Sequence, residues 1–334
     1  MSYLYVMEHG ATIQILGGYF VVKYKNGMEK RIPKETLEAI SLFGNISLSI
    51  NVIEECLRRG IPVNYYSKRG AYYGRLESTR HVNIFRQKKQ LVLSDDDKFS
   101  LELSKRMIQA KIHNQKVILR RYTKNTSSNT SDCIKSLNIA ESKVKDAKST
   151  DKLMGYEGYA SKSYFKGLEQ IVGEEFHFHG RNRMPPKDPV NSMLSLGYTI
   201  LMYEIYGQIE SRGLHPYAGF LHKDRERHPT LASDLMEEWR AVIIDATVLN
   251  LIRSEEIKAD MFETLEETGG VILNKQAMKV FIMSLEKKLM TEMNYLKYID
   301  YRCSFRRAFW LQIGQLIKAI EAENPEIYEP IRIR

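Results

Sequence analysis

Residues 11–24 read Ala-Thr-Ile-Gln-Ile-Leu-Gly-Gly-Tyr-Phe-Val-Val-Lys-Tyr. Two runs rich in β-branched and aromatic residues flank Gly17-Gly18, a pattern typical of two strands joined by a tight turn. A second hairpin signal follows at Asn26-Gly27, because this dipeptide readily adopts the backbone conformations that tight turns require. The stretch therefore predicts consecutive antiparallel strands near the start of the chain.

The same character extends over the first 85 residues. One helix is expected at Ile50–Arg59, which has an apolar side and is followed by Gly60 as a stop signal. Further strand-like runs lie at residues 3–6, 62–66 and 71–76. The sequence therefore predicts a small β-rich domain over residues 1–85.

Beyond about residue 95 the apolar residues recur with a helical period. Ser94 and the three aspartates after it suit a helix N-terminus, because acidic side chains complement the helix dipole. A polar stretch, Asn125–Ser131, interrupts the pattern. Helical segments are predicted at residues 98–124, 134–152, 157–171, 190–211, 232–250, 276–300 and 303–323.

These elements predict an α+β protein in which a small β-rich domain precedes a larger all-α domain. We expect a linker at residues 86–97 and the helical domain at residues 98–323. Residues 324–334 contain two prolines and end in alternating Ile and Arg, which predicts an extended tail.

The composition excludes several protein classes. The chain has 334 residues, 43% of them hydrophobic and 27% charged, which does not fit a disordered, collagen-like or coiled-coil protein. Three widely spaced cysteines favour neither a disulfide framework nor a zinc site. The first ten residues do not resemble a signal peptide, and no run of 18 apolar residues occurs. We therefore expect a cytoplasmic protein without a membrane partner.

The net charge of +9 favours a polyanionic partner. The first 90 residues carry 14 basic and 7 acidic side chains, so most of the excess lies there. Between Leu103 and Thr130 no acidic residue occurs, which is compatible with a solvated helix face or with a track for phosphates. Seven basic residues lie in this stretch: Lys105, Arg106, Lys111, Lys116, Arg120, Arg121 and Lys124.

Candidate metal ligands come from three separate segments. Glu157 lies between two glycines, Gly155 and Gly158. His222 ends the apolar segment 213–222, and Asp234 and Glu237 lie one helical turn apart. Each also has an ordinary structural interpretation: a dipole-compensating Glu, a structural His, and an acidic first turn capped by Ser233. Together they would supply carboxylate oxygens and one imidazole, a ligand set that suits Mg²⁺ or Mn²⁺.

A proline-rich loop between the first two segments carries several cations. Arg181, Arg183 and Lys187 are candidate phosphate contacts there. His177 and His179 form a His-x-His pair, but no cysteine or third histidine nearby completes a zinc site. Neither a P-loop nor a dinucleotide-binding glycine pattern is present.

With these segments the chain resembles the CRISPR-associated endonuclease and integrase family of spacer acquisition over almost its whole length. Four ordered blocks carry the resemblance. They are Glu-Gly-x-Ala-x-x-x-Tyr-Phe at 157–165, Gly-Arg-Asn-Arg-x-Pro-Pro-x-Asp-x-Val-Asn at 180–191, Gly-x-x-Pro-Tyr-x-Gly-Phe-Leu-His at 213–222 and Asp-Leu-Met-Glu-Glu-x-Arg at 234–240.

The resemblance implies that Glu157, His222 and Glu237 are catalytic metal ligands for Mg²⁺ or Mn²⁺. Asp234 is the alternative third ligand or a supporting catalytic carboxylate, and the choice between it and Glu237 stays open. Glu238 lies beside both. We also predict DNA contacts at six residues: Arg181, Arg183, Lys187, Lys223, Arg240 and Tyr164.

The resemblance further implies an assembly and a reaction. Two homodimers would flank a small second CRISPR-associated acquisition protein in a hetero-hexamer, with the β-rich domain serving dimerisation and the docking of DNA or a partner. The complex would insert a short DNA duplex into a CRISPR repeat by metal-assisted transesterification. The same site would cleave branched or single-stranded DNA with water as the nucleophile.

Two other functions remain compatible with the residues alone. A non-catalytic nucleic-acid-binding scaffold would need the same lysines and arginines. A metal-dependent hydrolase of small phosphate esters could use the same ligands, but it would leave the basic residues and the β-rich domain without a role.

Overall fold

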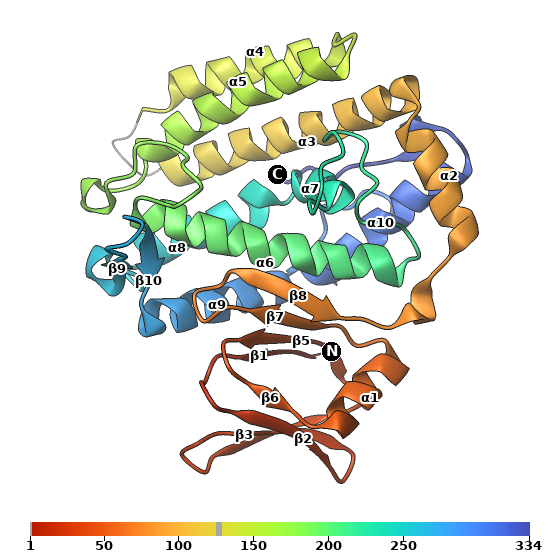
Figure 1. Cartoon of the computed structure of the whole chain (residues 1–334). Coiled ribbons are helices and arrows are strands. Elements are labelled where there is room, and N and C mark those ends of the chain that lie inside the picture. The colour runs from red at the N-terminus through yellow and green to blue at the C-terminus, as the bar shows by residue number, and fades with distance from the viewer. Residues whose placement is uncertain (1, 125–128) are drawn as a thin grey trace. The chain divides into compact units, whose positions relative to one another are not determined.

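The computed structural model describes residues 2–124 and 129–334, so residues 125–128 of the predicted polar break lie outside the described residues (Figure 1). The chain forms two compact units, and the boundary between them along the sequence falls between Asn83 and Ile84. The predicted order, a β-rich region followed by a mostly helical one, is confirmed.

The first unit contains two four-stranded sheets. In one, β1, β5 and β7 run parallel and β8 is antiparallel to β7; in the other, a meander of β4, β3 and β2 is joined by the short parallel strand β6. The bounds are β1 (Ser2–Val6), β5 (Leu37–Phe43), β7 (Val63–Tyr66), β8 (Tyr72–Leu76), β4 (Glu29–Pro33), β3 (Tyr19–Lys23), β2 (Thr12–Leu16) and β6 (Ser47–Leu48).

Turn chemistry sets these hairpins. Gly17 and Gly18 connect β2 to β3 with φ of 53° and 84°, and Gly27 connects β3 to β4 with φ of 83°. Helix α1 (Ile50–Arg59) ends where Gly60 adopts φ of 72° and its N–H reaches back to the last turn. Both predicted hairpins and the predicted helix are confirmed.

Strand β5 was not predicted, although it is central to its sheet. Nearly all of its side chains are buried, because it pairs with parallel strands on both edges. Its sequence, Leu-Glu-Ala-Ile-Ser-Leu-Phe, therefore lacks the apolar-polar alternation that marks a half-exposed strand. Side chains from both sheets and α1 form one hydrophobic core.

The second unit is built around the long helix α3 (Asp97–Thr123), which contacts α4, α5 and α7 (Figure 1). Asp96 caps its N-terminus by accepting a hydrogen bond from the Phe99 N–H, as the aspartate run predicts. The other α-helices are α2 (Ile84–Ser94), α4 (Ser131–Lys145), α5 (Thr150–Glu169), α6 (Pro189–Ser211), α7 (Thr230–Met236), α8 (Ala246–Arg253), α9 (Lys275–Met290) and α10 (Phe305–Glu321).

The segment predicted as a linker at residues 86–97 is mostly helix α2. Its Gln90 side chain is buried and forms three hydrogen bonds with the backbone of the loop after α6: the amide nitrogen donates to the carbonyls of His215 and Ala218, and the amide oxygen accepts from the His215 N–H. The linker interpretation overlooked α2 because five consecutive polar or basic residues, Arg86–Gln90, dominate its middle.

Other helix boundaries also differ from the prediction. The segment at 232–250 divides into α7, a π-helical turn at Arg240–Asp245 and α8. The predicted helix at 276–300 ends at Met290, where Thr291 turns to an extended conformation. Four short strands complete the second unit, so it is not purely helical: β9 (Phe262–Thr264), β10 (Val271–Leu273), β11 (Glu292–Met293) and β12 (Cys303–Ser304).

The C-terminal segment packs against α3. After a short 3₁₀ helix, Pro325–Ile327, the described residues have no regular structure, but Tyr328, Ile331 and Ile333 are buried. Asn114 of α3 donates hydrogen bonds to the carbonyls of Glu238 and Ile331 and accepts one from the Ile333 N–H. The alternating Ile and Arg residues thus form one strip with a buried and an exposed side.

Within the described part of the chain, no helix is long and apolar enough to cross a membrane.

We expect Asn114→Ala to destabilise the fold by about 3 kcal/mol, because it leaves three buried backbone groups without a partner. Gln109→Ala on the same helix is the control, since Gln109 accepts an exposed hydrogen bond from Arg332, whose loss should cost less than about 0.5 kcal/mol. Urea unfolding measures both, and equal free energies of unfolding for the two variants would contradict this assignment.

Candidate active site

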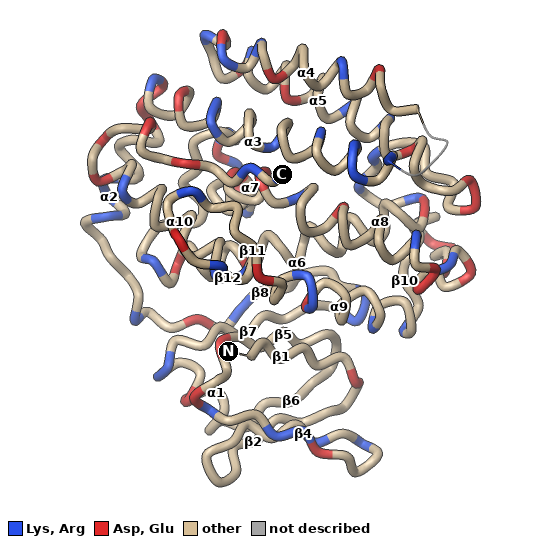
Figure 2. Tube along the Cα trace, turned by 180° about the vertical axis from the view of Figure 1, so that it is seen from behind, with Lys and Arg blue, Asp and Glu red and all other residues tan. Residues whose placement is uncertain are grey.

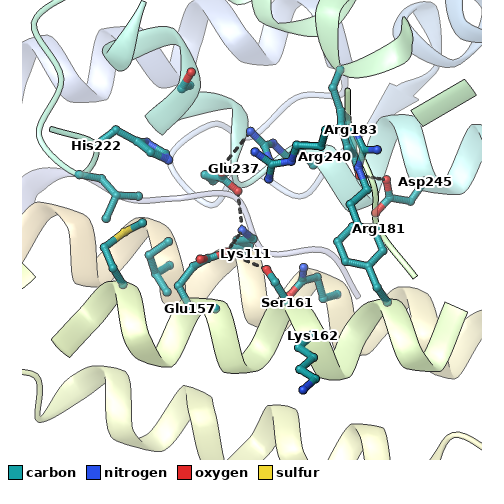
Figure 3. A pocket seen from close by; sticks show the side chains of 18 of the residues that line it. Lys111, Glu157, Ser161, Lys162, Arg181, Arg183, His222, Glu237, Arg240 and Asp245 are labelled. Atoms are coloured by element: carbon teal, nitrogen blue, oxygen red, sulfur yellow. Dashed lines mark hydrogen bonds and ion pairs between the residues drawn. The ribbon is translucent and has the colours of Figure 1, made fainter. Parts of the chain in front are cut away.

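Three of the four predicted catalytic residues line one cavity of about 920 Å³. Glu157 comes from α5, His222 from the loop between α6 and α7, and Glu237 directly follows α7 (Figure 3). Lys111 of α3 reaches the same space. Asp234 is buried in α7 and is not part of the lining.

Asp234 holds the loop that carries His222. One of its carboxylate oxygens accepts from the backbone N–H groups of Phe220 and Leu221 at 2.6 and 2.9 Å. The other accepts from the His222 N–H at 3.1 Å and lies 2.6 Å from His222 Nδ1. A Cβ on Gly219 would lie 2.7 Å from the Asp234 carboxylate, so only glycine allows this approach. With Nδ1 engaged, the imidazole keeps Nε2 for another ligand.

The environment of His222 favours its protonated form. Burial lowers its pKa, but the hydrogen bond and the charge of Asp234 raise it, and the net pKa is above the usual value for histidine. A cation bound at the imidazole must therefore compete with a proton.

Glu157 and Glu237 face each other across the ammonium group of Lys111. Lys111 Nζ contacts Glu157 Oε1 directly and lies 2.6 Å from Glu237 Oε2. Only 6% of the Lys111 side chain and 4% of the Glu237 side chain are exposed. Ser161 donates a hydrogen bond to Glu157 at 2.7 Å, and Arg240 lies 3.1 Å from the second oxygen of Glu237.

Both glutamates are ionised in this arrangement. Burial alone would raise the pKa of Glu237, but the charges of Arg240 and Lys111 lower it to about 2. Burial opposes ionisation of Glu157 as well, and the charge of Lys111 lowers its pKa below the usual value. The cavity thus holds one buried and one partly buried negative charge with internal cations beside them.

The basic stretch on α3 does not form a phosphate track. Lys111 and Lys116 are buried, and Lys116 pairs with Glu141. The basic residues that accompany them serve other partners: Lys105 pairs with Glu102, Arg106 donates to the carbonyls of Glu326 and Tyr328, and Arg121 donates to the carbonyl of Arg334. The track interpretation is wrong for Lys111 and Lys116, which are buried, and Arg106 and Arg121 bind the C-terminal segment.

A buried aspartate supports the wall of the cavity. Asp245 accepts hydrogen bonds from the hydroxyl groups of Tyr164 at 2.8 Å and Tyr198 at 2.6 Å. The guanidinium groups of Arg240 and Arg181 lie over the Tyr198 ring, 5.1 and 5.5 Å from its centroid. The predicted DNA contact of Tyr164 is wrong, because its side chain is fully buried and its hydroxyl group is engaged.

The proline-rich loop supplies two of the cations at the cavity. Arg181 donates to Asn191 at 2.8 Å and to Ser195 at 3.1 Å, so its position is fixed by α6. Arg183 is exposed and lines the cavity, whereas Lys187 is exposed but lies outside the lining. Lys223 and Arg240 also line the cavity. Four of the six predicted DNA contacts therefore surround the acidic pair.

Basic groups dominate this lining. It contains eight lysines and arginines against four acidic residues, which are the acidic pair, Glu169 and Asp245. Elsewhere in the second unit, both basic and acidic residues are distributed over the helices and loops (Figure 2). An oxyanion entering the cavity would meet cations around the acidic centre.

The donor set fits a divalent cation. Glu237 Oε2 is buried and accepts no correctly directed hydrogen bond from the described residues, although Lys111 lies close. Two carboxylates and one imidazole are suitable ligands for Mg²⁺ or Mn²⁺. Across residues 2–124 and 129–334, however, no three His, Cys, Asp or Glu side chains are grouped closely enough to hold an ion as they stand. The Lys111 ammonium separates the two glutamates.

Comparison with protein families gives a match to the family described as CRISPR associated protein Cas1 over residues 4–287. The chain belongs to the Cas1 family. The family resemblance identified from the four sequence blocks is thereby confirmed.

A relative from Mycobacterium tuberculosis named CRISPR-associated endonuclease Cas1 is 36% identical over 325 residues, covering 97% of this chain and 96% of the relative. A chain of a solved Cas6-RT-Cas1–Cas2 complex has a TM-score of 0.84 and 25% identity, and the match covers 100% of this chain and 36% of that longer one. A casposase bound to an integration product shares the fold, with a TM-score of 0.85 at 22% identity over 97% of this chain and 92% of that one.

Each of the four Cas1 blocks contributes to the cavity, but in different ways. Glu157, Arg181, His222 and Glu237 each come from a different block and line it. A Cβ atom added at Gly155 or Gly158 would have no heavy atom of the described residues within 4 Å. The two glycines therefore leave open space, and no neighbouring helix packs against them.

Sequence reasoning did not identify Lys111 and Asp245 as residues of the site. Lys111 could have been noticed, because it falls on the apolar side of α3 with Met107 and Ile108.

We expect Asp245 to make stability depend on pH. Burial raises its pKa from 3.8 to about 6, although the two tyrosines lower it. Between these values the folded protein holds a proton that the unfolded chain has lost, so the contribution of Asp245 to stability is fully present below pH 3.8 and is lost as the pH rises through about 6. The slope attributable to this residue is at most about 1.4 kcal/mol per pH unit.

Urea unfolding at several values from pH 4 to 7 measures this slope. Asp245→Asn should lose that part of the pH dependence, whereas Asp132→Asn, at a side chain that is 88% exposed, should keep it. The assignment fails if Asp245→Asn and the wild type show the same slope.

Proposed function

We propose that this Cas1-family protein is a metal-dependent DNA endonuclease and integrase that inserts short DNA duplexes into a CRISPR array. The observation that carries the proposal is the pair of ionised glutamates with His222 beside them, in a cavity otherwise lined by lysines and arginines. The M. tuberculosis relative is an endonuclease by name, and the casposase of the same fold is bound to an integration product. Both agree with nuclease and integration chemistry.

Glu157, His222 and Glu237 are the proposed ligands for Mg²⁺ or Mn²⁺. We assign Asp234 a positioning role, because its carboxylate accepts hydrogen bonds from the backbone at 220–222 and contacts the His222 ring. When bound, the metal ion would polarise the scissile phosphate and activate the attacking hydroxyl group. The protein itself fixes the imidazole and keeps the two glutamates ionised.

Strand transfer at this site is a transesterification. The 3′ hydroxyl oxygen of the incoming duplex forms a bond to a phosphorus of the target strand, and the bond from that phosphorus to its original 3′ oxygen breaks. The attacking hydroxyl loses its proton and the departing oxygen gains one, so the number of phosphodiester bonds does not change. With water as the attacking group the same step is hydrolysis, which accounts for cleavage of branched or single-stranded DNA.

Arg181, Arg183, Lys223 and Arg240 are positioned to hold DNA phosphates around the reacting centre. Lys187 stays a predicted contact outside the cavity. Arg240 also pairs with Glu237, so it connects phosphate binding to the acidic pair.

The proposed partners follow from the Cas1–Cas2 complex among the structural relatives. We infer a homodimer that binds a small Cas2-type protein, with two dimers per hetero-hexamer and the β-rich unit serving dimerisation and docking. The three cysteines are buried and free, which suits a reducing cytoplasm.

Glu157→Ala, His222→Ala and Glu237→Gln should each reduce Mn²⁺-dependent DNA cleavage and joining to background, because each removes a proposed ligand. Asp234→Asn should weaken metal binding by about 10–100-fold through misplacement of His222. Joining of a short duplex to a repeat-bearing plasmid, with and without the Cas2-type partner, provides the assay, and calorimetry with Mn²⁺ provides the binding constants.

Glu169→Gln is the control, because Glu169 lines the same cavity but faces His179. It should keep both activity and Mn²⁺ affinity. Wild-type activity in Glu157→Ala and His222→Ala would refute the proposed site. Wild-type protein that binds DNA but no Mn²⁺ would favour a non-catalytic scaffold.

Arg183→Ala should weaken DNA binding and lower the slope of log K against log salt by about one unit, the value for a single phosphate contact. Arg181→Ala should do the same and also lose stability, since Arg181 is bound to α6. Tyr164→Phe should leave the salt slope unchanged. Fluorescence anisotropy at several salt concentrations measures these slopes, and an unaltered slope for Arg183→Ala would exclude this contact.

A further inference from the structure

Lys111 occupies the space that a cation shared by Glu157 and Glu237 would take (Figure 3). Its ammonium group contacts one oxygen of each glutamate, and all three side chains are largely buried. It is the group that allows two buried carboxylates to face each other, because an unpaired buried charge is strongly unfavourable.

A divalent cation bound by these two oxygens would compete with the Lys111 ammonium group for them. Mg²⁺ binds carboxylate oxygens at about 2.0–2.1 Å and would lie where Lys111 Nζ now lies. Two cations at such a separation also repel each other strongly in a buried site. Lys111 must therefore leave the glutamates when the metal site is filled.

Gln115 offers Lys111 a second position. It lies one helical turn further along α3 and lines the same cavity, and residues four apart on a helix are neighbours. Only 4% of Gln115 is exposed, yet its side-chain oxygen has no hydrogen-bond partner among the described residues. Buried acceptors are normally satisfied, so this oxygen calls for a donor that the metal-free arrangement does not supply.

We propose that Lys111 is a two-position counter-cation, which bridges Glu157 and Glu237 in the metal-free protein and donates to the Gln115 side-chain oxygen when a divalent cation binds. The inference rests on the proposed function, because it takes the two glutamates as metal ligands. It explains why the described residues contain the ligand set but no preformed metal cluster.

Calorimetric titration of the full-length protein with Mn²⁺, combined with thermal melting of the metal-free protein, tests the proposal. Lys111→Met keeps the length of the side chain and removes the competing charge. It should lower the melting temperature without metal and bind Mn²⁺ about tenfold more tightly than the wild type. Unchanged or weaker Mn²⁺ binding would overturn the proposal, since a lysine that only supports the ligands would not compete with the ion.

Lys116→Met is the matched control. Lys116 lies on the same helix, is buried and pairs with Glu141 and Asn138 away from the site. Its replacement should lower the melting temperature similarly but leave Mn²⁺ affinity at the wild-type value. Tighter Mn²⁺ binding in Lys116→Met as well would mean that loss of any buried lysine has this effect, and would overturn the proposal.

Gln115→Met tests the second position of Lys111, and it keeps the proposal testable if Lys111→Met does not fold. It removes the acceptor while keeping the volume, so Mn²⁺ should bind severalfold more weakly and the metal-free melting temperature should not fall. Unaltered Mn²⁺ affinity would overturn the proposal. If the proposed function itself were wrong, the result would be distinguishable, because the wild-type protein would then bind no Mn²⁺ at all.

Discussion

A buried carboxylate, Glu237, and a partly buried one, Glu157, face each other in the second unit, and compensation of their charge governs the architecture around them. Glu157 and Glu237 come from different helical segments, and burial raises the pKa of each, which opposes ionisation. Lys111 from α3 lies between them, and Arg240 lies beside Glu237. The ion bridge therefore joins three segments at one point while leaving the carboxylates charged.

Helix α3 connects this bridge to the end of the chain. Lys111 and Asn114 are one helical turn apart; the first contacts Glu237 and the second donates to the carbonyl of Glu238 and binds the C-terminal segment. The Glu238 side chain accepts hydrogen bonds from Tyr328, Gln312 and the Ile331 N–H. The residue adjacent to a proposed ligand is thus anchored by α10 and by the C-terminal segment. Packing, rather than the site alone, sets the position of Glu237.

Much of the fold could be predicted because local chemistry determines it. The Gly17-Gly18 and Asn26-Gly27 turns and the apolar period of α3 agree with the structure. Strand β5 and helix α2 could not be recognised, because β5 is buried on both faces and α2 has a basic middle. These features depend on partners that are distant in sequence.

The candidate site was predictable in its residues but not in their roles. The sequence blocks identify Glu157, His222, Asp234 and Glu237, and only the geometry separates Asp234, which holds the loop, from Glu237, which faces the cavity. Counting charges assigned Lys111 to a basic run and could not show its carboxylate partners.

Diffraction from Mn²⁺-soaked crystals at the manganese absorption edge tests this account most directly. It predicts one anomalous peak bound by Glu157, Glu237 and His222 Nε2, with Lys111 displaced from the glutamates; Lys111 still between them, with manganese bound elsewhere or not at all, would contradict it.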